Sequence, residues 1–244
     1  MDNLDEIISK IQEIDNPEML NDYLILLSKN AKDIPSDLID FILNDLDSNL
    51  LEKVKINFIY LLGEIGTISK LDEKFYEYLV NNYFESDRWV RDEILQAFIK
   101  ISPNFAPNEK LLELLSFALN EDYLPIKEKA LELLIFIETI PMNILIILMK
   151  NLNSTSSVIL DKSIDIIKKN IKENNDLIDF LNYSKNYKFL NNRIIRSLLI
   201  NYINSFDTLN SFKELILKSK WEEEYKNLII NEIEIYEKIL LKRL

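Results

Sequence analysis

The fold of this chain is decided by the stretch Asp87-Arg88-Trp89-Val90-Arg91-Asp92-Glu93-Ile94-Leu95-Gln96-Ala97-Phe98. Its aliphatic–basic pair Val90-Arg91 lies 36 residues after Val54-Lys55 and 36 residues before Ile126-Lys127. A fixed period of this length predicts a repeat architecture, because each repeat buries its apolar face against its neighbours. In the same register, five further columns are apolar in all three copies: Phe58/Ile94/Ala130, Ile59/Leu95/Leu131, Leu61/Ala97/Leu133, Leu62/Phe98/Leu134 and Ile65/Ile101/Ile137.

The rest of the chain has the periodicity of α-helices. Apolar residues recur at spacings of three and four, and no sustained alternation with a period of two is present. Asn16-Pro17-Glu18 combines an N-cap, a proline at the first helical position and an acid in the first turn, and similar starts occur at Pro35, Pro107 and Pro141. We therefore predict an all-α chain of about fourteen helices.

The quoted stretch resembles the second-helix signature of HEAT and armadillo-like repeats, in which an Asp is followed by Val-Arg and then by small and aliphatic residues. Residues 122–134 are similar, and the resemblance covers roughly residues 36–140. Weaker copies follow near Leu160, Ile194 and Leu228, and another is expected at Leu20. The resemblance implies an α-solenoid of about seven antiparallel helix pairs with a period of about 36 residues. It specifies a fold rather than a reaction.

We expect this solenoid to be a single domain over residues 1–244, with an acidic part over 1–149. A mildly basic, more divergent part is expected over 150–220 and a C-terminal capping helix over 221–244. The apolar surplus of that last helix leaves two interpretations, a cap on the final repeat or a dimer contact, so monomer and homodimer both stay open.

Composition excludes several classes of chemistry. The 244 residues include no His, no Cys and two Gly, Gly63 and Gly66. Imidazole and thiol catalysis, zinc fingers, disulfides and glycine-rich phosphate loops are therefore ruled out. We predict no catalytic residue, no metal site and no cofactor, and so a protein that is not an enzyme.

Two enzyme families with HEAT-like repeats provide tests of this prediction. Deoxyhypusine hydroxylases use His-Glu pairs, and this chain has no His. Alkylpurine DNA glycosylases carry similar Trp-Val-Arg stretches and use Trp and Asp residues around an extruded base. Trp89 with Asp92 or Glu93 would be the only match, because Trp221 lies far away in the sequence. We expect Trp89 to be a buried packing residue instead.

The chain carries neither a basic leader nor a long apolar segment. Its N-terminus is acidic, and its longest apolar runs are far shorter than the ~20 residues that a membrane helix needs. We expect no membrane contact and a cytoplasmic location.

The second helix of each clear repeat should present a polar stripe away from the core. In a solenoid such faces line the concave side, where partners commonly dock. We predict a protein-interaction scaffold or adaptor whose curved acidic surface binds a basic partner, with a merely solvated face as the alternative. The predicted partner-binding residues are Tyr60, Glu64, Glu93, Gln96, Lys100, Lys129 and Glu132, flanked by Asn57 and Phe136.

A column of bases accompanies this stripe. Lys55, Arg91 and Lys127 occupy the same position in successive repeats. We expect these residues to pair with acids of the adjacent repeat, and a basic ladder in a groove is the alternative.

Charge is divided unevenly along the chain. The formal net charge is −12, but residues 1–149 hold 28 acids and 13 bases, whereas residues 150–244 hold 13 acids and 16 bases. The segment 183–196 mixes bases with aromatic residues, a combination that suits single-stranded nucleic acid or a phosphate group. As the alternative function we therefore predict anion binding there by Lys185, Lys188, Arg193 and Arg196.

Overall fold

The protein is all-α in the part of the chain that the computed structural model describes, which comprises residues 4–104, 107–152, 154–172, 174–184, 192–203 and 206–242. These residues form fourteen α-helices and two short 3-10 helices, so the all-α prediction is confirmed. The chain divides into two compact units, Met1–Phe136 and Ile137–Leu244. One continuous solenoid over both units stays a prediction.

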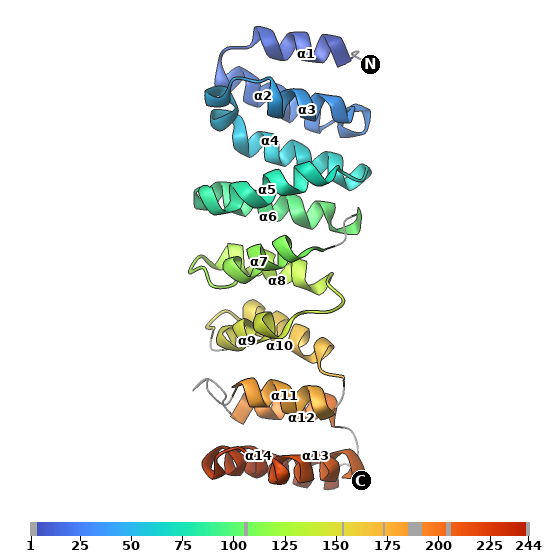
Figure 1. Ribbon diagram of the computed structural model, residues 1–244, viewed down its shortest axis with the longest axis vertical. Coiled ribbons are helices and arrows are strands. Elements are labelled where there is room, and N and C mark those ends of the chain that lie inside the picture. The colour runs from blue at the N-terminus through green and yellow to red at the C-terminus, as the bar shows by residue number, and fades with distance from the viewer. Residues whose placement is uncertain are drawn as a thin grey trace. The chain divides into compact units, whose positions relative to one another are not determined.

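The first unit has two layers of helices. The even-numbered helices α2, α4, α6 and α8 pack one against the next, while α1 packs on α3 and α5 on α7 in the other layer (Figure 1). Short turns connect successive helices. The elements are α1 (Leu4–Glu13), α2 (Pro17–Ser28), η1 (Ala31–Asp33), α3 (Ser36–Asn44), α4 (Ser48–Ile68), α5 (Glu73–Glu85), α6 (Arg88–Ile101), η2 (Ser102–Asn104), α7 (Glu109–Ala118) and α8 (Leu124–Ile135).

The second unit repeats this arrangement. Helix α12 packs on both α10 and α14, and α11 packs on both α9 and α13. Trp221 Nε1 donates to Asn182 Oδ1 at 3.0 Å, and Tyr236 Oη donates to the carbonyl of Ile203 at 2.6 Å. The helices are α9 (Met142–Asn151), α10 (Ser157–Asn170), α11 (Asn174–Ser184), α12 (Asn192–Tyr202), α13 (Phe206–Lys218) and α14 (Glu223–Leu241).

The apolar columns form the core, as the sequence predicts. All fifteen members of the five columns are buried, and none is more than 5% exposed. The polar positions between them are half-exposed on the outer face of α4, α6 and α8. The 36-residue register therefore separates inner from outer residues correctly in the alternate helices α4, α6 and α8.

The predicted helix starts are also confirmed. Asn16 Oδ1 accepts hydrogen bonds from the backbone N–H groups of Glu18 and Met19, at 2.8 and 3.4 Å. Asn108 caps α7 in the same way by accepting from Leu111 N at 2.9 Å. Such caps satisfy backbone donors that have no partner inside the helix. Helices α3 and α9 begin directly after Pro35 and Pro141.

The two glycines lie where α4 contacts α6. A Cβ at Gly63 would lie 3.1 Å from Cα of Ala97, and a Cβ at Gly66 would overlap the side chain of Ile101. Glycine disfavours a helix interior, so its presence here reflects the close approach of the neighbouring helix. Asn104 Nδ2 donates to the carbonyl of Gly66 at 3.0 Å, which satisfies an acceptor near the end of α4.

In the described part of the chain, no helix combines the length and the apolar character that crossing a bilayer requires.

Gly66→Ala tests this close packing. Alanine is favoured over glycine in a helix by up to about 1 kcal/mol, but the added methyl group would collide with the fully buried Ile101. We expect a net loss of about 1–3 kcal/mol in the free energy of unfolding, measured by chemical denaturation. Thr67→Ala is the control, since Thr67 is the exposed next residue and should change stability by no more than about 0.5 kcal/mol. A Gly66→Ala variant as stable as the wild type would contradict the tight contact.

Candidate interaction surface

The predicted partner-binding residues lie on one face of α4, α6 and α8, and all seven are half-exposed. Much of their charge is compensated within the chain. Lys100 Nζ of α6 lies 2.7 Å from Glu64 Oε1 of α4 and 4.0 Å from the ring centroid of Tyr60. Lys100 thus neutralises one residue of the neighbouring helix, Glu64, and lies over the aromatic ring of another, Tyr60.

The next pair of helices repeats this arrangement. Lys129 Nζ of α8 lies 2.6 Å from Asp92 Oδ2 of α6. On the other side of α4, Asn57 Nδ2 donates to Asn21 Oδ1 of α2 at 2.7 Å. The stripe is therefore a set of polar links between successive helices of one layer.

Glu93 is the unusual carboxylate of the stripe. The pKa of Glu93 is raised, chiefly because the side chain is buried. The positive charges of Lys100 and Lys129 lower this pKa, and the negative charges of Asp92 and Glu64 raise it further. Its Oε1 is buried and accepts no hydrogen bond from the described residues. Glu93 therefore opposes folding when it is ionised. Within the described ranges, no group of three carboxylates is placed to hold a metal ion.

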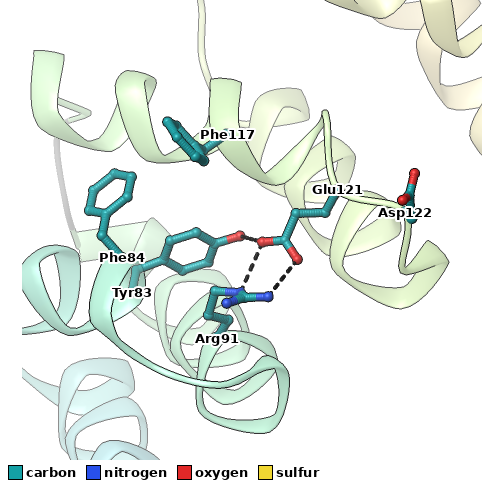
Figure 2. Close-up of a pocket in the computed structure, with 6 residues that line it drawn as sticks. All are labelled: Tyr83, Phe84, Arg91, Phe117, Glu121 and Asp122. Carbon is teal, nitrogen blue, oxygen red and sulfur yellow. Dashed lines mark hydrogen bonds and ion pairs between the residues drawn. The ribbon is translucent and has the colours of Figure 1, made fainter.

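The basic column behaves differently in each copy. Lys55 pairs with Glu52 of its own helix, and Lys127 is half-exposed on α8. Only Arg91 has the expected partner in the adjacent helix pair. Its Nε and Nη2 lie 3.0 Å from Glu121 Oε1 and Oε2, in a bidentate ion pair (Figure 2). The expected pairing across repeats is thus confirmed for Arg91 and wrong for Lys55.

The Arg91–Glu121 pair belongs to a larger network. Tyr83 Oη of α5 donates to Glu121 Oε1 at 2.6 Å, and Arg91 Nη1 donates to the carbonyl of Ser86 at 2.8 Å. Burial and the hydrogen bond to Glu121 raise the pKa of Tyr83, so its hydroxyl stays protonated and remains a donor. The network joins α5 and α6 to the turn between α7 and α8.

A pocket of about 240 Å³ lies over this network, lined by Tyr83, Phe84, Arg91, Phe117, Glu121 and Asp122 (Figure 2). Phe84 of α5 and Phe117 of α7 stand at one end with an edge-to-face contact, their ring centroids 5.3 Å apart. Both side chains are exposed, by 43% and 60%. Asp122 is exposed at the opposite end.

Trp89 is also exposed, so the predicted packing role is wrong. The residue is 55% exposed, and the guanidinium of Arg88 lies 4.7 Å from its ring and 5.4 Å from the ring of Tyr123. Its backbone N–H is held by the N-cap Asp87 at 2.9 Å, so Trp89 sits in the first turn of α6, at the margin of the core.

The turns within the predicted helix pairs lie along one edge of the first unit (Figure 1). The turns 14–16, 45–47, 86–87 and 119–123 contain six acids and no base. Of these acids only Glu121 forms an ion pair with a described residue, although Asp47 and Asp87 also cap helices. We call these residues the acidic turn edge: Asp15, Asp45, Asp47, Asp87, Glu121 and Asp122.

The predicted anion-binding segment is described only in part. Lys185, Lys188 and the side chain of Arg193 lie outside the described residues. Arg196 Nε of α12 lies 2.7 Å from Oε2 of Glu232 of α14, whose carboxylate is only 1% exposed. A buried carboxylate needs a paired cation, so Arg196 has a structural partner within the chain.

The sequence reasoning missed the pocket residues, although one signal was present. Phe84 lies seven residues after Glu77 on α5, and Phe117 lies seven residues after Lys110 on α7. Glu77 and Lys110 form an exposed ion pair at 2.6 Å, so both aromatic residues continue outward-facing stripes. A large apolar residue at a solvent-facing helix position is the pattern that points to such a surface.

Glu121→Gln tests the structural weight of the network. The change removes the charge that faces Arg91 in a mostly buried position, so we expect a loss of about 1–3 kcal/mol in the free energy of unfolding. Glu77→Gln is the matched control: it alters a pair that is about half exposed on both sides, which should contribute at most about 1 kcal/mol. Equal losses for both variants, measured by urea denaturation, would show that the network contributes no more than a surface pair.

Glu93 gives a pH-dependent prediction. Because the pKa of Glu93 is raised in the folded state, the unfolded chain loses this proton first as the pH rises. The contribution of Glu93 to stability therefore falls between its ordinary pKa and the raised one. Glu93→Gln should raise the melting temperature at pH 7, and this gain should vanish below the ordinary glutamate pKa of about 4.3. The exposed Glu113→Gln is the control, and a gain independent of pH would refute the assignment.

No protein-family model and no curated protein matches this sequence. Among solved structures, the chain is similar to the crystal structure of an engineered protein that was a target of the Northeast Structural Genomics Consortium. The two chains are 14% identical with a TM-score of 0.48, and the match covers 96% of this chain and 97% of the other. A likeness of this size assigns neither a family nor a function.

Proposed function

We propose that this protein is a non-catalytic scaffold or adaptor, built of HEAT-like helix pairs, that binds a partner protein with a basic surface. The acidic turn edge of the first unit is the proposed docking region. One observation carries the proposal: the exposed side chains of Phe84, Trp89 and Phe117 adjoin turns whose acids have almost no internal counter-charge.

The charge distribution supports a basic partner. Residues 1–136 hold 27 acids and 13 bases. On the polar stripe, Lys100 and Lys129 already neutralise Glu64 and Asp92. Among the described residues, only Glu121 of the turn edge has such a basic partner, so the other five acids there keep a negative potential at the surface. Complementary potentials accelerate association and select partners by charge.

The aromatic residues supply the apolar part of the docking region. Tryptophan and other large aromatic side chains dominate the energetics of protein interfaces. Exposed rings without an apolar cover mark interaction sites when they gather on one part of a surface. Phe84 and Phe117 contact each other, and Trp89 lies at the start of the helix that follows Phe84.

The HEAT-like part of the proposal rests on recurrence. The contacts Asn57–Asn21 and Lys100–Glu64 each join residues 36 positions apart, and Tyr83–Glu121 joins residues 38 apart. In a solenoid, every repeat contacts only its neighbours, so such separations recur along the chain. We extend this arrangement to all seven predicted helix pairs.

We also propose a cytoplasmic location for this scaffold.

Affinity capture tests the proposed function. The purified chain, immobilised, is exposed to a cell extract at low and at high salt, and bound proteins are identified by mass spectrometry. We expect proteins with basic surfaces that are released at high salt, because exposed charges are screened over about 10 Å at 0.1 M salt.

The strongest binder is then purified and its affinity is measured by calorimetry. The edge variant Asp15→Asn/Asp45→Asn/Asp122→Asn should weaken binding about tenfold, if each exposed charge contributes about 0.5 kcal/mol. Asp22→Asn/Glu73→Gln/Glu109→Gln removes three exposed acids away from the edge and serves as the control. Binding that ignores salt, or that both triple variants weaken equally, would rule out the acidic turn edge as the docking region.

A further inference from the structure

The floor of the pocket beside Phe84 and Phe117 consists of Tyr83, Arg91 and Glu121, which pair with one another (Figure 2). The carboxylate of Glu121 accepts hydrogen bonds from Tyr83 Oη and Arg91 Nη2 and lies 3.0 Å from Arg91 Nε in the ion pair. The remaining terminal nitrogen of Arg91 donates to the carbonyl of Ser86. The charges of Arg91 and Glu121 cancel. A ligand in this pocket is therefore recognised chiefly by the walls rather than by the floor.

The walls differ at the two ends of the pocket. Phe84 and Phe117 form an apolar wall at one end, with exposed ring surface. Asp122 provides a carboxylate at the other end, and no described lysine or arginine pairs with it. Glu85 at the end of α5 and Asp87 in the turn that follows are both exposed and add negative charge nearby. The pocket thus combines aromatic surface with an uncompensated negative charge.

Other aromatic rings of the first unit already have cations of this chain nearby. Arg88 lies by Trp89 and Tyr123, Arg91 lies 5.9 Å from the ring of Tyr83, and Lys100 lies by Tyr60. Among the described residues no lysine or arginine lies over Phe84 or Phe117, although both rings are exposed beside acids. No cation of the described chain therefore covers these two rings, and their exposed apolar surface can receive the aliphatic stem of a basic side chain from outside.

We propose that this pocket receives a lysine or arginine side chain of the partner protein. This proposal rests on the proposed function, because the side chain comes from the basic partner. The aliphatic stem lies along Phe84 and Phe117, and the cationic head is directed to Asp122. Long basic side chains have this division into an apolar stem and a charged end. The acidic turn edge supplies the surrounding potential that orients the basic segment.

Two other occupants fit the pocket less well. An anion could approach Arg91, but Glu121 neutralises that guanidinium and Asp122 repels an anion. A purely apolar side chain could contact the phenylalanine rings, but it would leave the carboxylate of Asp122 partly desolvated without a partner, which is unfavourable.

NMR titration with defined peptides tests the proposal. The probes are three acetylated and amidated peptides with the same alternating Gly-X sequence, in which X is lysine, norleucine or glutamate. Norleucine has the aliphatic stem of lysine without its charge. We expect the lysine peptide to shift the backbone amide signals of Phe117 and Asp122 and to bind about tenfold more tightly than the norleucine peptide.

Variants identify the contacts. Phe117→Ala and Asp122→Asn should each weaken the lysine peptide about three- to tenfold. Phe136→Ala and Asp45→Asn remove an exposed ring and an exposed turn carboxylate outside the pocket, and they should leave its affinity unchanged. Because all four side chains are exposed, circular dichroism should report an unchanged fold.

Three results would overturn the proposal. Equal binding of the norleucine peptide would make the pocket a simple apolar groove. Shifts of the same amides by the glutamate peptide or by inorganic phosphate, without an effect of lysine, would make it an anion site. Absence of shifts with all three peptides would mean that the pocket binds none of these side chains.

The two proposals can fail separately. If a captured basic partner binds Phe117→Ala and Asp122→Asn as tightly as the wild type, the pocket assignment is wrong while the adaptor function stands. If the lysine peptide binds as expected but no basic partner is captured, the pocket assignment stands and the adaptor function is wrong.

Discussion

The contact between α4 and α6 sets the geometry on which the first unit depends. The chain places its two glycines in this contact, opposite Ala97 and Ile101, so the two helices approach closely. The apolar columns then lie in register from α4 to α6 to α8. Because each helix offers the same apolar face to the next, the polar residues beside that face also come to matching heights.

This register explains why four ion pairs of the first unit share one order. In the even-numbered layer, an acid of one helix meets a lysine of the next, as in Glu64–Lys100 and Asp92–Lys129. The other layer follows the same order, with Asp40–Lys74 and Glu77–Lys110. In these four pairs the acid precedes the base along the chain, whereas in Arg91–Glu121 and Arg196–Glu232 the base comes first. Exposed pairs of this kind stabilise little individually, but they occupy the charges of the helix faces.

The sequence predicted those features that depend on local or periodic signals. Burial of the columns follows from the 36-residue period, and the start of α2 follows from Asn16-Pro17-Glu18. The outward stripe was placed on the correct face, but its internal pairing was not anticipated. That pairing depends on which charged residues occupy matching positions of neighbouring helices. The apolar columns do not name those residues, although the 36-residue separation of Glu64 and Lys100 signals this pair.

The misassigned residue Trp89 and the missed residues Phe84 and Phe117 all lie outside the apolar columns. Trp89 was expected to be buried because large aromatic residues usually are, but its place directly after the N-cap Asp87 sets it at the margin of the core. Phe84 and Phe117 belong to the first helices of their pairs. The 36-residue columns were found in the second helices, so they do not predict which residues of the first helices are exposed. Each phenylalanine occupies a position in an otherwise polar, outward-facing stripe. Its position in that stripe predicts exposure, whereas hydrophobic composition alone does not.

A basic partner has physical reasons to prefer the turn edge over the polar stripe. On the stripe its cations would compete with Lys100 and Lys129, and displacing either lysine would break a link between helices. At the turns, no described lysine or arginine forms an ion pair with Asp45 or Asp122, so a cation there would exchange only water and salt ions. Such exchange chiefly increases the association rate. The exposed rings add an apolar contact that salt screens little, and differences in affinity between related complexes lie mostly in the dissociation rate. For the proposed partner, acids and rings side by side would therefore give the turn edge both rapid capture and retention, whereas the stripe would provide neither without loosening the layer that carries it.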